Sequence, residues 1–276
     1  MRVRVNGVEI AYDERGRGAR PFVLVHGFTG FRGDFATQLD LLGEEHRVLV
    51  PDLRGHGASG WSADPADYTL ARLGEDLLGF LDALDVADCD LLGHSMGGML
   101  ALRAALARPE RIASLVLMNT APGPLAWVDP GQLALASRVA SEAGMTALAT
   151  ILRMRAQDDP QRGEPDRRVE REWGEERFWA WRTARIEAMD PAAYAALGRA
   201  LIEQEDLSHR LGAIRARTTV LVGELDAEFR APAAALARGI PGAHLVVLPG
   251  AGHQPQHEAP AAWRAAIVEH LARAAG

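Results

Sequence analysis

Short apolar runs alternate with longer amphipathic segments over most of the chain, and this alternation predicts the fold class. Residues 2–5 and 8–12 flank Asn6-Gly7, which is the strongest short-range signal for a β-hairpin. Beyond this hairpin the expected strands are wholly apolar, at residues 22–25, 48–50, 91–92, 115–118, 220–222 and 245–248. Runs without polar alternation are typical of strands buried on both faces, and hence of a parallel sheet covered by helices.

Helical segments occupy the longer intervals between these strands. The pattern predicts helices at residues 34–42, 70–84, 97–108, 231–238 and 261–275. Regular alternation of strands and helices indicates an open α/β fold.

One interval, residues 121–207, contains no strand-like run and is expected to be helical. It holds four of the six tryptophans, at positions 127, 173, 179 and 181. One interpretation is a solvated helical insertion whose aromatic side chains pack into a small core of its own. The other is a lid whose apolar underside covers a substrate pocket. The two interpretations can hold together, each for a different face of the insertion. For the lid, we predict that Trp127 and Trp179 bind substrate.

The amino-acid composition excludes several classes of catalytic site and binding partner. All 30 basic residues are arginine, so the chain lacks the lysine of a Schiff base, a pyridoxal phosphate enzyme or a P-loop. Cys89 is the single cysteine, which excludes an intramolecular disulfide and disfavours a cysteine-built metal site. The net charge of -7 predicts no nucleic-acid partner. The N-terminus has no apolar signal core, and no run approaches roughly 18 apolar residues, so we expect a cytoplasmic protein without a membrane partner.

The most informative stretch is Gly93-His94-Ser95-Met96-Gly97, between a buried strand and an expected helix. Glycines two residues either side of a serine permit a sharp strand-to-helix turn, because side chains there would meet neighbouring backbone. Such a turn exposes the hydroxyl of Ser95 at the N-terminus of a helix, where a developing anion is stabilised. In this context we interpret Ser95 as a nucleophile rather than as a chance serine in a glycine-rich turn.

A serine nucleophile needs a base and a group that orients the base. His253 follows the last expected strand, and Asp226 follows the strand before it, so both lie with Ser95 beyond the carboxyl ends of parallel strands. Glu224 is a weaker candidate for the acid, and His257, four residues after His253, a weak metal ligand. No metal and no cofactor are expected.

Attack of a serine on a carbonyl carbon produces an oxyanion, and stabilising that oxyanion takes two N–H donors. Met96, directly after the serine, supplies one, and Phe28, in the loop after the first parallel strand, is the expected source of the other. Phe28 and His94, which flanks the nucleophile, are also predicted to contact substrate.

Taken together, the motifs resemble those of the α/β-hydrolase superfamily, specifically its small bacterial members with a lid. The segments that carry the resemblance are His26-Gly27-Phe28, residues 52–59, residues 93–98, residues 223–226 and residues 252–260. The resemblance implies an α/β-hydrolase fold with an eight-stranded, mostly parallel sheet, helices on both faces and a helical cap inserted after the sixth strand. It places the core at residues 1–121 and 209–276 and the cap at 122–208. It also implies Ser95 as nucleophile, His253 as general base and Asp226 as orienting acid.

The resemblance also limits the reaction. Haloalkane dehalogenases and epoxide hydrolases of this fold use an aspartate where this chain has Ser95. The main hypothesis is therefore hydrolysis of a carboxylic ester with a small to medium, apolar or aromatic acyl group. A lactonase, a carbon–carbon bond hydrolase, a lyase like that of the menaquinone pathway and a cofactor-free perhydrolase remain as alternatives, as does a catalytically silent ligand-binding protein. The expected partner is a small ester-like molecule, and the chain is expected to be a monomer or homodimer. Arg54, Arg153 and Arg155 are candidates for a substrate carboxylate, although solvated or ion-paired roles are favoured.

Overall fold

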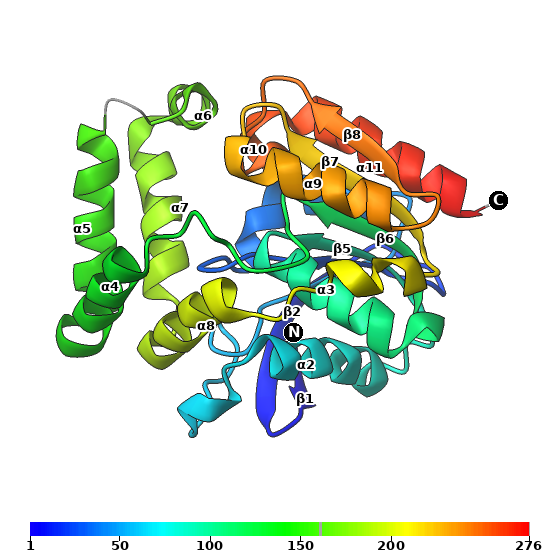
Figure 1. Ribbon diagram of the computed structural model, residues 1–276, viewed down its shortest axis with the longest axis horizontal. Coiled ribbons are helices and arrows are strands. Elements are labelled where there is room, and N and C mark those ends of the chain that lie inside the picture. The colour runs from blue at the N-terminus through cyan, green and yellow to red at the C-terminus, as the bar shows by residue number, and fades with distance from the viewer. Residues whose placement is uncertain (160–161, 276) are drawn as a thin grey trace.

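The computed structural model describes residues 1–159 and 162–275 and contains an eight-stranded sheet (Figure 1). Its strand order is β1-β2-β4-β3-β5-β6-β7-β8. β1 pairs antiparallel with β2 and β2 with β4, whereas all the remaining pairs are parallel. The strands are β1 (Arg2–Val5), β2 (Val8–Arg15), β3 (Phe22–Val25), β4 (Val48–Pro51), β5 (Cys89–His94), β6 (Ile112–Met118), β7 (Arg217–Gly223) and β8 (His244–Leu248). Each apolar run found in the sequence lies in one of them, which confirms the predicted sheet.

The hairpin between β1 and β2 forms at the predicted Asn6-Gly7. Both residues have positive φ, 45° at Asn6 and 89° at Gly7. Two successive positive φ values are what a tight turn between twisted antiparallel strands requires, and this pair of residue types tolerates them.

Helices cover both faces of the sheet because successive side chains of each strand point to opposite sides. One face packs against α1 (Ala36–Gly43) and α11 (Pro260–Ala275), the other against α2 (Leu70–Ala83), α3 (Met96–Ala107) and α9 (Ala227–Gly239). The predicted helix at 231–238 starts too late: α9 begins at Ala227 and contains Pro232, a residue that disfavours helix interiors and so conceals the first turn. Short 3-10 helices lie at Arg32–Phe35, Pro65–Asp67, Pro109–Arg111 and Ser208–Ala213.

The strand at the edge of the sheet departs from the expected burial. β8 is apolar from Leu245 to Leu248, yet Leu245 is 37% exposed and Val247 42%. Only the α11 side of this strand is well covered, by packing around Val246. A continuous apolar run therefore did not indicate burial on both faces at the sheet edge.

The helical cap lies between β6 and β7 and forms a separate group of helices to the left in Figure 1. It contains a buried cluster of Val169, Phe178 and Trp179, with Trp173 and Trp181 packed against it. The described part of residues 121–207 contains no strand, as predicted. The cap helices are α4 (Pro130–Ala143), α5 (Met145–Asp158), α6 (Glu164–Trp173), α7 (Glu175–Glu187) and α8 (Pro191–Glu203).

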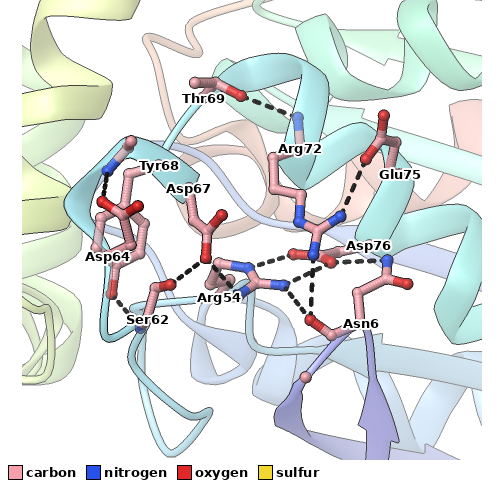
Figure 2. A network of polar contacts seen from close by, with 12 residues as sticks. Asn6, Arg54, Ser62, Asp64, Asp67, Tyr68, Thr69, Arg72, Glu75 and Asp76 are labelled. Atoms are coloured by element: carbon pink, nitrogen blue, oxygen red, sulfur yellow. Dashed lines mark hydrogen bonds and ion pairs between the residues drawn. The ribbon is translucent and has the colours of Figure 1, made fainter.

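A polar network joins the first hairpin to α2 and the loop after β4 (Figure 2). At its centre Arg54, 1% exposed, donates from Nε and Nη2 to both oxygens of Asp76, at 2.6 and 2.9 Å. Its Nη2 also donates to the carbonyl of Asn6 at 3.1 Å, and the Asn6 amide donates to Asp76 at 2.9 Å. Arg54 was one of the candidates for a substrate carboxylate. Its hydrogen bonds instead join the β1–β2 hairpin, the loop after β4 and α2, and we call this group of segments the framework.

No helix within residues 1–159 and 162–275 is both long enough and apolar enough to cross a membrane.

Candidate active site

Ser95 occupies the sharp turn that the sequence predicts. β5 ends at His94, α3 begins at Met96, and Ser95 between them has φ 54° and ψ −119°. A Cβ at Gly93 would lie 2.3 Å from the carbonyl oxygen of Gly97, and a Cβ at Gly97 would lie 2.4 Å from that of Val25. Glycine is required at both places, so the motif builds a strained backbone that presents the serine at a helix N-terminus.

Asp226 and His253 meet beside this turn. His253 Nδ1 lies 2.8 Å from Asp226 Oδ2, and the aspartate side chain is 6% exposed against 36% for the histidine. An ionised carboxylate only accepts hydrogen bonds, so Nδ1 carries the proton. This tautomer leaves Nε2 of His253 unprotonated, as a general base requires.

Asn119 completes the surroundings of the aspartate and was missed by the sequence argument. It follows β6, is fully buried and has φ 46°. Its amide donates to Asp226 Oδ2 and, at 3.1 Å, to the carbonyl of Gly252. The rule that located Asp226, a polar side chain soon after the carboxyl end of a buried strand, also points to Asn119, which directly follows β6.

The backbone around His253 is held from two sides. His94 Nε2 donates to the carbonyl of His253 at 2.7 Å. Burial, reinforced by the neighbouring His253, keeps the pKa of His94 well below its usual range, so the ring is neutral. On the other side Glu258 Oε2 accepts from the backbone N–H of Gly252 at 2.6 Å and of Gln254 at 3.1 Å.

One cap arginine reaches the same loop. Arg168 on α6 donates to the carbonyl of Gly250 at 2.8 Å and to that of Glu258 at 2.7 Å. These two carbonyls lie before and after His253, so Arg168 connects the cap directly to the segment that carries the histidine.

Burial raises the pKa of the Glu258 carboxyl to about 7, although the hydrogen bonds from the backbone N–H groups of Gly252 and Gln254 lower it.

A cavity of about 420 Å³ contains Ser95 and His253. Phe28 and Thr29 border it from the core, and Trp181, Arg182 and Arg185 border it from α7. A second cavity of about 580 Å³ lies under the cap and shares Phe28, Thr29 and Arg182 with the first. The two cavities therefore adjoin and extend from Ser95 towards the cap.

The two residues expected to form the oxyanion hole lie next to the nucleophile. Met96 is fully buried as the first residue of α3. A Cβ at Gly27 would lie 3.0 Å from the Cβ of Ser95, so the loop that carries Phe28 packs against the serine. Their N–H groups remain predicted donors.

Of the four predicted substrate-binding residues, three border one of the two cavities and one borders neither. Phe28 and His94 border the Ser95 cavity, although His94 Nε2 is already engaged by His253. Trp179 borders the second cavity, with its Nε1 donating to Glu170 at 2.7 Å. Trp127 borders neither cavity; it is 42% exposed and packs edge-on against Phe229.

The weaker candidates take structural positions. Glu224 is exposed and accepts from the backbone N–H of Gly250 at 2.9 Å. His257 is buried between the rings of Trp173 and Trp181, and burial lowers its pKa to about 3. Within the described residues, no group of three or more His, Cys, Asp or Glu side chains has an arrangement suited to a metal ion.

Comparison with known proteins agrees with this architecture. A dihydrolipoyllysine-residue acetyltransferase component of an acetoin cleaving system from Pseudomonas putida is 34% identical over 255 residues, covering 88% of this chain and 61% of that protein, so the chain spans under two thirds of this relative. The enol-lactonase of Burkholderia xenovorans superposes with a TM-score of 0.83 at 29% identity, covering 99% of this chain and all of the other. A thermophilic esterase from Thermogutta terrifontis gives a TM-score of 0.79 at 29% identity, covering 99% and 98%.

The family model described as alpha/beta hydrolase fold matches residues 20–260, from the strand before the Phe28 loop to the start of the last helix. Since that match includes the serine turn, the cap and the histidine loop, the chain belongs to the α/β-hydrolase fold family.

Proposed function

We propose that the protein is a serine hydrolase that cleaves carboxylic esters through an acyl-enzyme on Ser95. One observation carries the proposal: the Asp226–His253 hydrogen bond of 2.8 Å lies at the cavity that also contains Ser95 on its strained turn. Membership of a hydrolase family, with an enol-lactonase and an esterase among its structural neighbours, supports a hydrolytic reaction.

In the acylation step, Ser95 Oγ attacks the ester carbonyl while His253 Nε2 takes the hydroxyl proton. The imidazolium that forms is stabilised by Asp226, which accepts from Nδ1 and stays ionised. Asn119 holds the carboxylate by donating to the same oxygen. His253 then gives its proton to the leaving alcohol, and the acyl group remains on Ser95.

The negative charge on the tetrahedral intermediate is assigned to the N–H groups of Met96 and Phe28. The N-terminus of α3 adds favourable potential at this point, because its first N–H groups have no partner within the helix. Deacylation repeats the sequence with water as nucleophile, activated by His253. Water is the only co-reactant, and the products are an acid and an alcohol.

The aromatic side chains that line the cavities favour a small to medium acyl group with an apolar portion. Phe28 borders both cavities and packs against Tyr194 at 5.1 Å between ring centroids. Trp181 adds an aromatic wall above the serine. A lactone is the second candidate, favoured by the fit to an enol-lactonase over 99% of this chain. The same steps open a cyclic ester, with the leaving alcohol still attached to the acyl group.

Turnover of 4-nitrophenyl esters of short and medium chain length tests the proposal. We expect release of 4-nitrophenol by the wild type and a loss of at least about 10³-fold in kcat for Ser95→Ala. Ser141→Ala, at an exposed serine of α4, serves as the matched control and should retain wild-type turnover. Lack of turnover with every ester, or equal turnover by Ser95→Ala, would contradict the proposal. Faster turnover of a lactone would make linear esters a side activity.

A further inference from the structure

The α7 side of the Ser95 cavity is unusually rich in positive charge. Arg182 and Arg185 both border the cavity, one turn apart on α7, together with Trp181. Arg182 is ion-paired with Asp166 and lies over the rings of Phe178 and Trp179. Its charge is therefore matched by a carboxylate that belongs to the cap.

Arg185 is held in a fixed position by two groups. Its guanidinium lies over the Trp181 ring, 4.9 Å from the centroid, and its Nε is 3.1 Å from Asp34 Oδ1. The Arg185 side chain is only 12% exposed and that of Asp34 is fully buried. Asp34 follows the loop that carries Phe28, so the arginine is anchored beside the expected oxyanion hole.

The two Nη groups of Arg185 have no such partner. Within residues 1–159 and 162–275 neither of them donates a hydrogen bond, and the ion pair to Asp34 is made through Nε. The buried polar atoms here that lack a hydrogen bond are Nε of Arg185 and both oxygens of Asp34, whereas the Nη groups are not among them and so keep access to solvent. The paired N–H geometry of the guanidinium matches the two oxygens of a carboxylate.

Apart from Asp34, the acidic groups of the described residues that border or adjoin the cavity do not form an ion pair with Arg185. Asp226 is engaged by His253 and Asn119, and Asp166 by the cap arginines Arg162 and Arg182. Burial raises the pKa of Glu258 to about 7, so near neutral pH it does not carry a full negative charge.

We infer that Arg185 forms a carboxylate subsite, and that the preferred substrates are esters or lactones that carry a second, ionised carboxylate. The Nη groups of Arg185 hold that carboxylate while the ester carbonyl lies at Ser95, with Trp181 and Phe28 against the chain between them. This inference rests on the proposed ester hydrolysis and specifies its substrate class.

Two esters of equal chain length test the inference: mono-4-nitrophenyl adipate, which is anionic, and 4-nitrophenyl hexanoate, which is neutral. For the wild type we expect kcat/KM to be about tenfold higher for the adipate, the size of one charge-assisted contact. Arg185→Gln should lose that preference, so that kcat/KM for the adipate falls to about that for the hexanoate. The matched control is Arg177→Gln, which removes an exposed α7 arginine that lies over Trp173 outside the cavity and should leave the preference intact.

Removal of Arg185 leaves Asp34 without its ion-pair partner, so the double variant Asp34→Asn, Arg185→Gln removes both charges together. It too should hydrolyse hexanoate without preferring adipate. Hexanoate turnover without a wild-type preference for adipate, or an adipate preference that survives in both variants, overturns the carboxylate subsite and leaves the esterase proposal standing. Failure of the wild type to hydrolyse either ester overturns the esterase proposal itself.

Discussion

Two groups of arginines in this protein differ in what surrounds their guanidinium groups. In the framework, Arg54 donates to both oxygens of Asp76 and to a backbone carbonyl (Figure 2). On α7, Arg182 and Arg185 each have one carboxylate partner and otherwise lie over aromatic rings. A ring face offers attraction to the cation without consuming its N–H donors.

The difference separates a structural arginine from one available to a ligand. Arg54 is surrounded by acceptors from the β1–β2 hairpin, the loop after β4 and α2, so its hydrogen bonds fix the mutual positions of these segments. Arg185 is fixed in place by Trp181 and Asp34 while its Nη groups remain unbonded within the described part of the chain. In a chain without lysine, arginine serves both purposes, and the local acceptors decide which.

The largest expected effect is the loss of stability when Arg54 is replaced. Arg54→Gln leaves the Asp76 carboxylate, 4% exposed, without its partner, and removal of one member of a buried ion pair costs about 3–5 kcal/mol. We expect urea unfolding to show a loss of that size. The double variant Arg54→Met, Asp76→Leu should recover much of it, since no charge remains unpaired. A loss below about 1 kcal/mol for Arg54→Gln would remove the distinction between the two groups.

An intermediate effect is expected where the cap meets the loop that carries His253. Arg168→Ala removes both hydrogen bonds from α6 to the segment around His253, so the histidine loses part of its support. We expect kcat for a 4-nitrophenyl ester to fall about tenfold or more with KM nearly constant, because a small misplacement of a catalytic group slows the chemical step.

The matched control for this variant is Arg171→Ala, also on α6, whose exposed side chain pairs with Glu164. Arg168→Lys should recover part of the activity, since an ammonium can still donate to one carbonyl. If Arg168→Ala changes KM alone, or if Arg171→Ala has the same effect, the cap does not support His253 through this residue.

The smallest expected effect is the pH dependence that Glu258 contributes to stability. Burial raises its pKa in the folded protein from 4.5 to about 7, so between these values the folded state binds a proton that the unfolded state has released. The free energy of unfolding should therefore fall as the pH rises from about 4.5 to about 7.

Glu258→Gln keeps an oxygen for the Gly252 N–H and cannot ionise, so this part of the pH dependence should vanish in urea unfolding at pH 5 and pH 8. Glu142→Gln, at an exposed position of α4, should behave as the wild type. The same decline with pH in wild type and Glu258→Gln would show that this carboxyl is not the source.

Features determined by neighbouring residues were predictable from the sequence. The Asn6-Gly7 turn and the glycines around Ser95 follow from backbone sterics within a few positions, and the apolar runs mark the strands. The burial of β8 was not predictable, because it depends on the strand's place at the sheet edge.

Features that depend on distant pairs were missed. Asp34 lies in the β3–α1 connection and Arg185 in the cap, so no local pattern relates them. The links from Arg168 and Glu258 to the histidine loop end on backbone atoms, which carry no residue-specific signal. Trp127 was expected at the substrate because of its residue type, whereas its position against Phe229 depends on how the chain enters the cap.

Covalent labelling tests the central claim, that Ser95 is an activated nucleophile, most directly. After incubation with a fluorophosphonate, intact-mass and peptide analysis should find one adduct, on Ser95, in the wild type and none in Ser95→Ala. His253→Ala should be labelled far more slowly, because the base that removes the hydroxyl proton is gone. A wild type without an adduct on Ser95, or one labelled as fast without His253, would contradict the account.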